Sequence, residues 1–411
     1  MNLKSILLGA AAAAAAATGA QAADLPVAPE PVDYVRVCDA FGTGFFYIPG
    51  TETCLRVGGR VRADFYFNDF GDQGSIGGIV GSSSNAWDAR SGNGTSTRAR
   101  GYIRLDARTN TEYGLVRAYV DTYFTADSGS STGTTLDKAF IQFGSFTFGR
   151  TGSFFDYYTG NAFNKQSQVF SDKGSTWVAA YTAAFGNGIS ATVSVEDGTY
   201  RTVAGSTQSV TTTTVNGVAV NSITSTSNAA GHRFPDLVAN LRVDQGWGSA
   251  QIMGALHESR LRNTASKTKV GYAIGAGVTF KLPMIAAKDS ITFQAQYADG
   301  ATSYMGNANN SYADVVFANG QTKTTKGWSV SAGATHYWTA QWSTNLDASY
   351  GKLDRPFGLA DVTQWNVAGN LVWEPVSGLI FGGELEYQNV DIKGSPSKDS
   401  IVGMFRVQRT F

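Results

Sequence analysis

The chain has 411 residues with 32 basic and 32 acidic side chains, so its formal net charge is zero. This balance gives no argument for a nucleic-acid partner or for an acidic one. Forty-eight glycines, twenty-four phenylalanines, eighteen tyrosines and only nine prolines are typical of strands joined by tight turns. After the amino-terminal segment there is no apolar run of about 18 residues, which excludes a helical membrane span but leaves a β-barrel open.

The amino-terminal segment, residues 1–22, has the pattern of a secretory signal peptide. Lys4 precedes an alanine-rich apolar core, and the last three residues match an A-x-A cleavage signal. The apolar core is too short for a transmembrane anchor. We therefore expect cleavage between Ala22 and Ala23 and export of the mature chain.

The chain contains two cysteines, Cys38 and Cys54. In an exported protein a disulfide is the expected state of such a pair. A metal site is the alternative, but no histidine lies near either cysteine. We predict a disulfide that closes a short loop just before the first long strand.

Residues 55–67 alternate strictly between two kinds of side chain. Val57, Val61 and Phe65 fall on one face of a strand, and Arg60 and Arg62 fall on the other. In a soluble sandwich the charged face would meet water and the apolar face a second sheet. In an outer-membrane barrel the apolar face meets lipid and the charged face lines an aqueous lumen.

The alternation recurs in sixteen segments, and the connections between them decide between the two architectures. We expect strands at 55–67, 97–109, 115–125, 136–144, 146–151, 176–185, 188–196, 235–244, 249–258, 270–281, 290–298, 327–337, 342–351, 364–374, 378–389 and 399–411. Every odd-numbered connection is long: 68–96, 126–135, 152–175, 197–234, 259–269, 299–326, 352–363 and 390–398. Every even-numbered connection is short, and long loops at one end only are typical of outer-membrane barrels.

The sequence therefore predicts an all-β fold, a sixteen-stranded antiparallel transmembrane β-barrel with long extracellular loops and short periplasmic turns. Residues 55–411 would form the barrel, and residues 23–54 would form a periplasmic segment held by the disulfide. The long connections 68–96 and 197–234 are rich in Gly, Ser, Thr and Asn, and we expect them to be loops within one domain. Tryptophans near the strand ends predict two aromatic girdles, with ordinary core tryptophans as the alternative: Trp247, Trp328, Trp338, Trp342, Trp365 and Trp373.

Six arginines fall on the polar face of three adjacent strands and predict a basic wall in the lumen: Arg60, Arg62, Arg98, Arg100, Arg104 and Arg117. Guanidinium groups stay charged at any reachable pH, and we expect Asp156 and Asp172 of the third long connection to oppose them. A field between two such walls sorts ions and orients solutes. The alternative is that individual arginines pair with the aspartates of their own face, Asp64, Asp106 and Asp121.

Several blocks of the chain resemble a known family. Residues 23–27, 38–42 and 44–59 are similar to the mature amino terminus of porins from alphaproteobacteria of the Rhizobium–Brucella group. Lys138–Gly144 and Phe146–Arg150 resemble the strand pair that precedes the constriction loop of general porins.

The resemblance implies a sixteen-stranded barrel, usually a homotrimer, that passes ions and small hydrophilic solutes by diffusion. It also implies that the third loop, about 152–175, folds into the lumen, although the Pro-Glu-Phe-Gly-Gly element of enteric porins is absent. Arg150 is a pore-lining candidate on this resemblance alone, because Phe146 and Phe148 share its parity. The terminal Phe411 resembles the signal read by the outer-membrane assembly machinery, from which Arg409 departs.

The expected location is the outer membrane of a Gram-negative cell. The expected partners are further copies of the chain, outer-membrane lipid and lipopolysaccharide, the assembly machinery, and diffusing solutes. We expect no nucleic acid, cofactor, metal or catalysis, because the three histidines are far apart in the strand map and no nucleophile motif accompanies them. Two alternatives stay open: a channel of the same fold that prefers certain substrates, which Tyr66, Tyr102, Tyr119 and Tyr123 leave possible, and a soluble secreted adhesin.

Overall fold

The computed structural model describes residues 36–67, 90, 93–164, 169–172, 174–202, 206–215, 218–227, 229–306 and 313–411. The expected cleavage site at Ala22 and Ala23 lies outside these residues, as does most of the first long connection. In the described part of the chain, no helix is long and apolar enough to cross a membrane.

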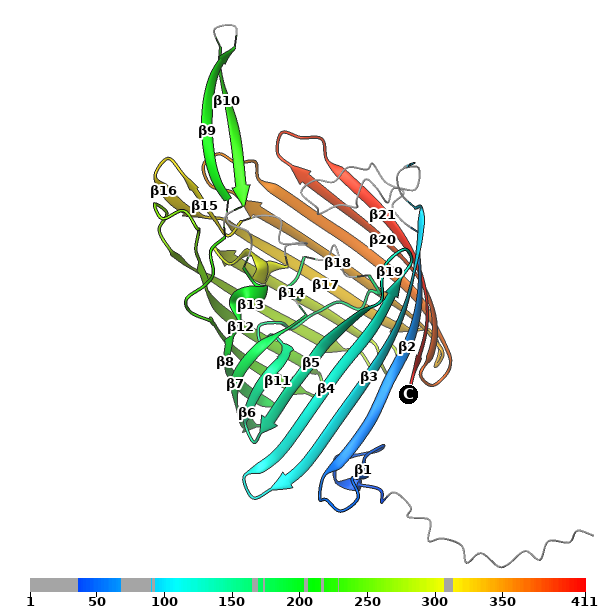
Figure 1. Ribbon diagram of the computed structural model, residues 1–411. Helices are drawn as coiled ribbons and strands as arrows, with labels where there is room; N and C mark the ends of the chain where they lie inside the picture. The colour runs from blue at the N-terminus through cyan, green and yellow to red at the C-terminus, as the bar shows by residue number, and fades with distance from the viewer. Residues whose placement is uncertain are drawn as a thin grey trace, which may run out of the picture.

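Sixteen antiparallel strands form one closed barrel, as the sequence predicts (Figure 1). They are β2 (Cys54–Phe67), β3 (Thr95–Thr111), β4 (Gly114–Asp127), β5 (Gly133–Phe143), β6 (Phe146–Gly152), β7 (Ser175–Gly186), β8 (Ile189–Glu196), β11 (Asp236–Gln245), β12 (Gly248–Ser259), β13 (Lys269–Lys281), β14 (Ser290–Asp299), β17 (Lys326–Tyr337), β18 (Trp342–Asp354), β19 (Val362–Val376), β20 (Leu379–Ile392) and β21 (Lys398–Thr410). The barrel closes where β2 pairs with β21, and Gly59 and Phe411 exchange two backbone hydrogen bonds at the end of that seam.

The side chains follow the predicted two faces. Val61 of β2 is 59% exposed on the outer surface, whereas Asp64, three residues along the same strand, is 1% exposed and points into the lumen. Large apolar side chains dominate the exposed residues of nearly every strand. This inside-out distribution suits a barrel whose outer surface meets lipid.

The aromatic girdles are confirmed. The six tryptophans near the strand ends are between 37% and 64% exposed, which excludes the core alternative. At the end with the short turns, the rings of Trp342 and Trp373 stack 5.8 Å apart. At the opposite end, Trp365 packs against Tyr387 at 4.9 Å. Amphipathic rings in two bands are expected at the two membrane interfaces.

The longest connections contain more structure than predicted. Residues 197–234 carry a hairpin of β9 (Ser206–Val215) and β10 (Val218–Ser227), which projects above the barrel in Figure 1. Residues 299–326 carry β15 (Val315–Ala318) and β16 (Gln321–Thr324), and β15 pairs in parallel with β9. Short 3₁₀-helices η2 (Gly198–Tyr200) and η3 (Thr302–Met305) lie in the same connections. Threonine and valine favour strands, so a polar composition alone did not identify a loop here.

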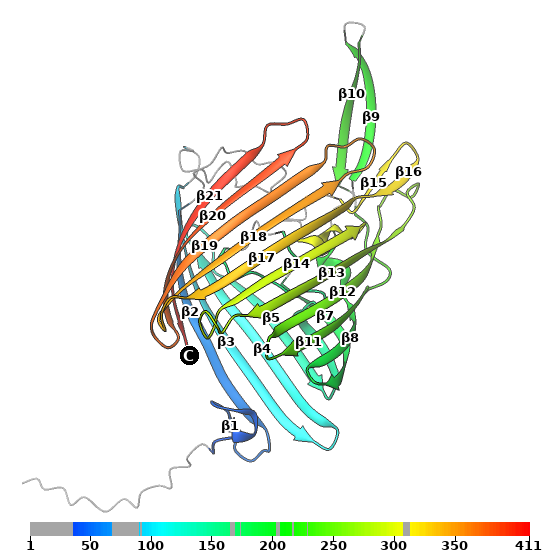
Figure 2. The same ribbon diagram turned by 180° about the vertical axis from the view of Figure 1, so that it is seen from behind.

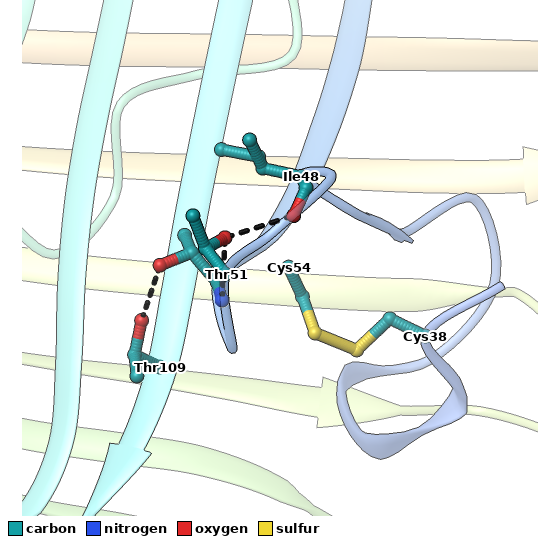
Figure 3. The surroundings of a disulfide bond; sticks show 6 residues. Cys38, Ile48, Thr51, Cys54 and Thr109 are labelled. Carbon is teal, nitrogen blue, oxygen red and sulfur yellow. Dashed lines mark hydrogen bonds between the residues drawn. A yellow bond between two sulfur atoms is a disulfide. The ribbon is translucent and has the colours of Figure 1, made fainter. Parts of the chain in front are cut away.

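The predicted disulfide is confirmed at the end of the barrel with the short turns (Figure 3). Cys38 and Cys54 are both buried with Phe45, between the 3₁₀-helix η1 (Asp39–Phe41) and the start of β2. A short strand β1 (Phe46–Tyr47) pairs with β2 in the same region. The crosslink closes a loop of 16 residues and contributes about 2–4 kcal/mol of stability by restricting the unfolded chain.

Candidate functional site

The third loop connects β6 and β7, and its described residues, 153–164, 169–172 and 174, lie against the inner face of the barrel wall. Near its start, the backbone amide of Phe154 donates to Glu196 of β8 at 2.9 Å. Farther along, the amide of Tyr158 donates to Gln294 of β14 at 2.8 Å. Glu196 and Gln294 occupy lumen-facing positions, so the loop runs inside the barrel and along the wall shown in Figure 2.

Two lumen carboxylates hold the tip of the third loop. Asp347 of β18 accepts hydrogen bonds from the backbone amides of Asn161 and Ala162, at 2.7 and 2.5 Å, and from the Tyr158 hydroxyl. Glu384 of β20 accepts from the next two amides, those of Phe163 and Asn164, at 2.5 and 2.7 Å. Hydrogen bonds to an ionised carboxylate are roughly twice as strong as neutral ones. We call Asp347 and Glu384 the loop anchors.

Glycines on the inner face make room for the side chains of the third loop. A Cβ atom on Gly277 of β13 would lie 2.3 Å from the Tyr157 ring. A Cβ atom on Gly333 of β17 would lie 1.6 Å from the Tyr158 hydroxyl oxygen. Larger residues at these positions would displace the loop, so these glycines help to set its course.

The base of the third loop holds the first predicted acid, Asp156, in a buried ion pair. Arg201, just after η2, donates to Asp156 at 3.0 Å and to Ser171 at 2.8 Å, and its guanidinium lies 4.2 Å from the Tyr304 ring centroid. Burial raises the pKa of Asp156 to about 6, partly offset by Arg201. The prediction that Asp156 faces the arginines is wrong, because its charge is used within the loops. The second predicted acid, Asp172, is exposed and accepts from the amide of Gly174.

The same buried contacts join the third loop to the rest of the extracellular side. Tyr304 of η3 packs edge-on against Phe155 at 4.8 Å and donates to Asp236 of β11 at 2.6 Å. His257 of β12 lies 2.8 Å from the same carboxylate. Reasoning from the sequence did not identify this network, because its members belong to five separate segments of the chain.

The six predicted arginines lie together on the inner face of β2, β3 and β4, and we call them the arginine wall: Arg60, Arg62, Arg98, Arg100, Arg104 and Arg117. The strand register places Arg62 directly opposite Arg100, and Arg60 opposite Tyr102. The third loop follows the inner face from β8 to β20, so the open part of the lumen lies between the loop and this wall.

Most arginines of the wall have a carboxylate partner on their own face. Arg104 binds Asp121 at 2.7 Å, and Arg98 binds Asp127 at 2.6 Å. Arg117 binds Asp106, which Arg108 also binds. Arg62 binds Asp64, which also accepts two hydrogen bonds from Arg406 of β21. The pairing with Asp64, Asp106 and Asp121 that the sequence left open therefore holds for three of the six arginines, and Arg98 pairs instead with Asp127. Arg60 and Arg100 form no ion pair with any described residue.

Arg150 does not belong to the wall. It lies opposite Trp177 in the register of β6 and β7, and Trp177 is 54% exposed on the outer surface. Its guanidinium rests 4.9 Å from the Tyr200 ring centroid and donates to the backbone carbonyl of Leu136. The prediction that Arg150 lines the pore is wrong, and the parity of Phe146 and Phe148 had indicated the outward direction.

A family model described as "Porin subfamily" matches residues 24–408. Porin Omp2b of Brucella neotomae is 32% identical over 428 residues, an alignment that covers all of both chains. Among solved structures, the outer-membrane channel DcaP of Acinetobacter baumannii is 18% identical with a TM-score of 0.67, over 89% of this chain and 99% of that one. The trimer form of OmpT of Vibrio cholerae is 8% identical with a TM-score of 0.50, over 88% of this chain and 100% of that one.

These findings favour a channel over an enzyme and over a soluble adhesin. The matched family, the full-length relatives and the closed sixteen-stranded barrel agree with one another. The chain therefore belongs to the porin family and is an outer-membrane porin, a water-filled β-barrel channel for the passive diffusion of ions and small hydrophilic solutes.

Proposed function

We propose that the third loop and the arginine wall together form the constriction of this porin, and that the wall makes the channel prefer anions. One observation carries the proposal. The lumen-facing positions of β2, β3, β4 and β21 hold nine arginines and only four aspartates. Asp64, Asp106 and Asp121 are buried. Asp127 keeps 38% of its side chain exposed, and Arg98, Arg104 and Arg117 keep 26%, 36% and 21% of theirs.

The opposite side of the lumen does not restore the balance. The loop anchors Asp347 and Glu384 are 2% and 4% exposed and point at the backbone of the third loop. Asp156 is paired with Arg201. A permeating ion therefore passes accessible guanidinium groups on one side and a hydrogen-bonded loop on the other, and selectivity follows the charge that lines the narrow zone.

The test is the triple variant Arg60→Ala, Arg62→Ala, Arg98→Ala, measured as the reversal potential of single channels across a potassium chloride gradient. Removing three positive charges is expected to move the reversal potential toward cation preference. The shift should be largest at low salt, because the screening length falls to about 3 Å at 1 M. An unchanged reversal potential in a correctly folded triple variant would remove the wall from the conduction path.

We also propose the organisation of the whole chain and its partners. Residues 1–22 would be a signal peptide, 23–54 a periplasmic segment, and 55–411 the barrel, with Phe411 as part of the assembly signal. The chain would form a homotrimer in contact with lipid and lipopolysaccharide and would catalyse no reaction. The trimer form of OmpT supports self-association. Slow migration of unheated protein in detergent gels, collapsing to one chain on heating, tests the trimer.

A further inference from the structure

The two arginines of the wall that lack a carboxylate partner meet at one place in the lumen. The Arg60 guanidinium lies over the ring of Tyr102, 4.0 Å from its centroid. The Arg100 guanidinium lies over the neighbouring ring of Tyr123 at 4.4 Å and donates to the Tyr102 hydroxyl at 3.2 Å. The two rings are 5.0 Å apart. These four side chains form one continuous set of contacts, with the two rings tilted by 46° to each other, and we call them the arginine–tyrosine cluster.

The cluster carries positive charge that the described residues do not neutralise. Arg60 forms no ion pair with them, and its buried Nε has no hydrogen-bond partner among them. Among the described residues, Arg100 donates to two neutral oxygens, those of Thr125 and Tyr102. Directly opposite Arg100 in the strand register stands a third cation, Arg62. Like charges at directly opposed positions of a sheet repel each other.

The cluster also holds its guanidinium groups in a fixed orientation. Stacking on an aromatic face restrains the guanidinium plane, and this contact is itself attractive. The N–H groups at the edge of the plane then remain available. Their forked geometry matches two oxygens of a carboxylate or a phosphate, whereas a halide ion has no second atom to engage.

We propose that the arginine–tyrosine cluster is a binding site for small oxyanions, carboxylates and phosphates, as they pass through the channel. The proposal rests on the proposed function, since it places the site on the conducting side of the lumen. It adds a distinction that charge alone does not make: oxyanions bind at Arg60 and Arg100, and chloride passes with less delay.

The experiment measures how inorganic phosphate, and separately acetate, reduces the chloride current through single channels. The main variant, Arg60→Gln with Arg100→Gln, removes the two unpaired guanidinium groups. A matched control, Arg98→Gln with Arg104→Gln, removes the same charge from arginines that Asp127 and Asp121 already bind. A third variant, Arg60→Lys with Arg100→Lys, keeps the charge but loses the forked donors. Heat-dependent gel migration confirms the folding of each.

The half-blocking phosphate concentration is expected to rise about tenfold or more in the glutamine pair at the cluster, and no more than about threefold in the matched control. Phosphate is expected to block the lysine pair at least about fivefold more weakly than the native channel, because the charge remains but the forked donors are lost. Equal weakening in the main variant and the control would overturn the site, as would phosphate block in the lysine pair equal to that of the native channel.

The same recordings separate this site from the proposed function. If both glutamine variants shift the reversal potential but neither changes the phosphate block, the wall sets selectivity and the binding site is wrong. If no variant shifts the reversal potential, the wall does not face the conduction path, and the proposed function fails with it.

Discussion

On β2, β3 and β4 the charged groups of the lumen are mostly arginines that remain partly exposed, whereas on β8, β18 and β20 they are carboxylates buried beneath the third loop. Glu196, Asp347 and Glu384 accept hydrogen bonds from loop amides and are between 2% and 4% exposed. Arg60 and Arg100 lie over tyrosine rings and keep guanidinium N–H groups that form no hydrogen bond with the described residues. One side of the lumen therefore builds the narrow zone, and the other presents charge to what passes through it.

The two sides should respond differently to substitution. Changes among the buried groups are expected to alter the size and steadiness of the pore by releasing the loop. Changes among the arginines are expected to alter which ions pass and to leave the pore size nearly unchanged. Four substitutions or conditions test this difference.

The largest effect is expected for Arg201→Met at the base of the third loop. The change leaves the buried Asp156 carboxylate without its cation, and breaking a buried pair in this way costs about 3–5 kcal/mol. Single-channel recordings should show a larger and fluctuating conductance. Arg201→Lys, which keeps the charge, is the control and should fluctuate less. A steady native conductance in Arg201→Met would mean that the loop does not depend on this pair.

A smaller effect is expected for Asp347→Asn at the loop tip. The amide cannot supply the charge-assisted acceptor of three donors, and hydrogen bonds to charged groups contribute about 1.5–3 kcal/mol each. Because Glu384 still holds the next two amides, the loop should loosen without leaving the lumen. Conductance should rise modestly, with added current noise. Loss of ion selectivity at native conductance would show that Asp347 acts on passing ions and does not hold the loop.

The docking of the third loop is also expected to depend on pH, through the protonation of the buried Asp156. Burial raises its pKa to about 6 in the docked loop, so the proton favours the docked state. This contribution is complete below the ordinary aspartate pKa near 4 and is lost as the pH rises through 6. Lowering the pH from 7 to 5 should strengthen docking by about 1.4 kcal/mol and reduce current noise. Asp156→Asn should abolish the difference, and noise that persists unchanged in native protein at both pH values would contradict the assignment.

The smallest effect is expected for Arg104→Gln on the wall. Arg104 binds Asp121 and is partly exposed, and such pairs contribute about 0–1 kcal/mol to stability. Folding and conductance should be native, and only the reversal potential should shift slightly toward cations. A large change in conductance would show that the wall also supports the loop.

Alternation along the chain was sufficient to predict the barrel. Every strand of the barrel lies within three residues of its expected bounds, and the six arginines of the wall lie on the predicted face. Strand parity carries this information, because neighbouring side chains must point to opposite faces. The same parity indicated that Arg150 points outward. The prediction that Arg150 lines the pore relied on the family resemblance and was wrong.

The arrangement of the third loop was beyond such reasoning. Asp347 and Glu384 are lumen-facing by parity, but nothing local distinguishes an acid that binds loop amides from one that faces water. Tyr158 and Asp347 are 189 residues apart in the chain, and other hydrogen-bond partners of the loop are separated by similarly long stretches of sequence. The sequence did contain one usable signal, because Gly277 and Gly333 occupy inward-facing positions. In an open, water-filled pore a side chain would fit there, so a glycine indicates that something packs against the strand.

The most direct test of the account is the reversal potential of the native channel across a low-concentration potassium chloride gradient. Nine lumen arginines against four aspartates predict a reversal potential on the chloride side, one that shrinks as the salt concentration rises and screening increases. A reversal potential of zero, or one on the potassium side at low salt, would contradict the claim that the arginine wall governs what passes.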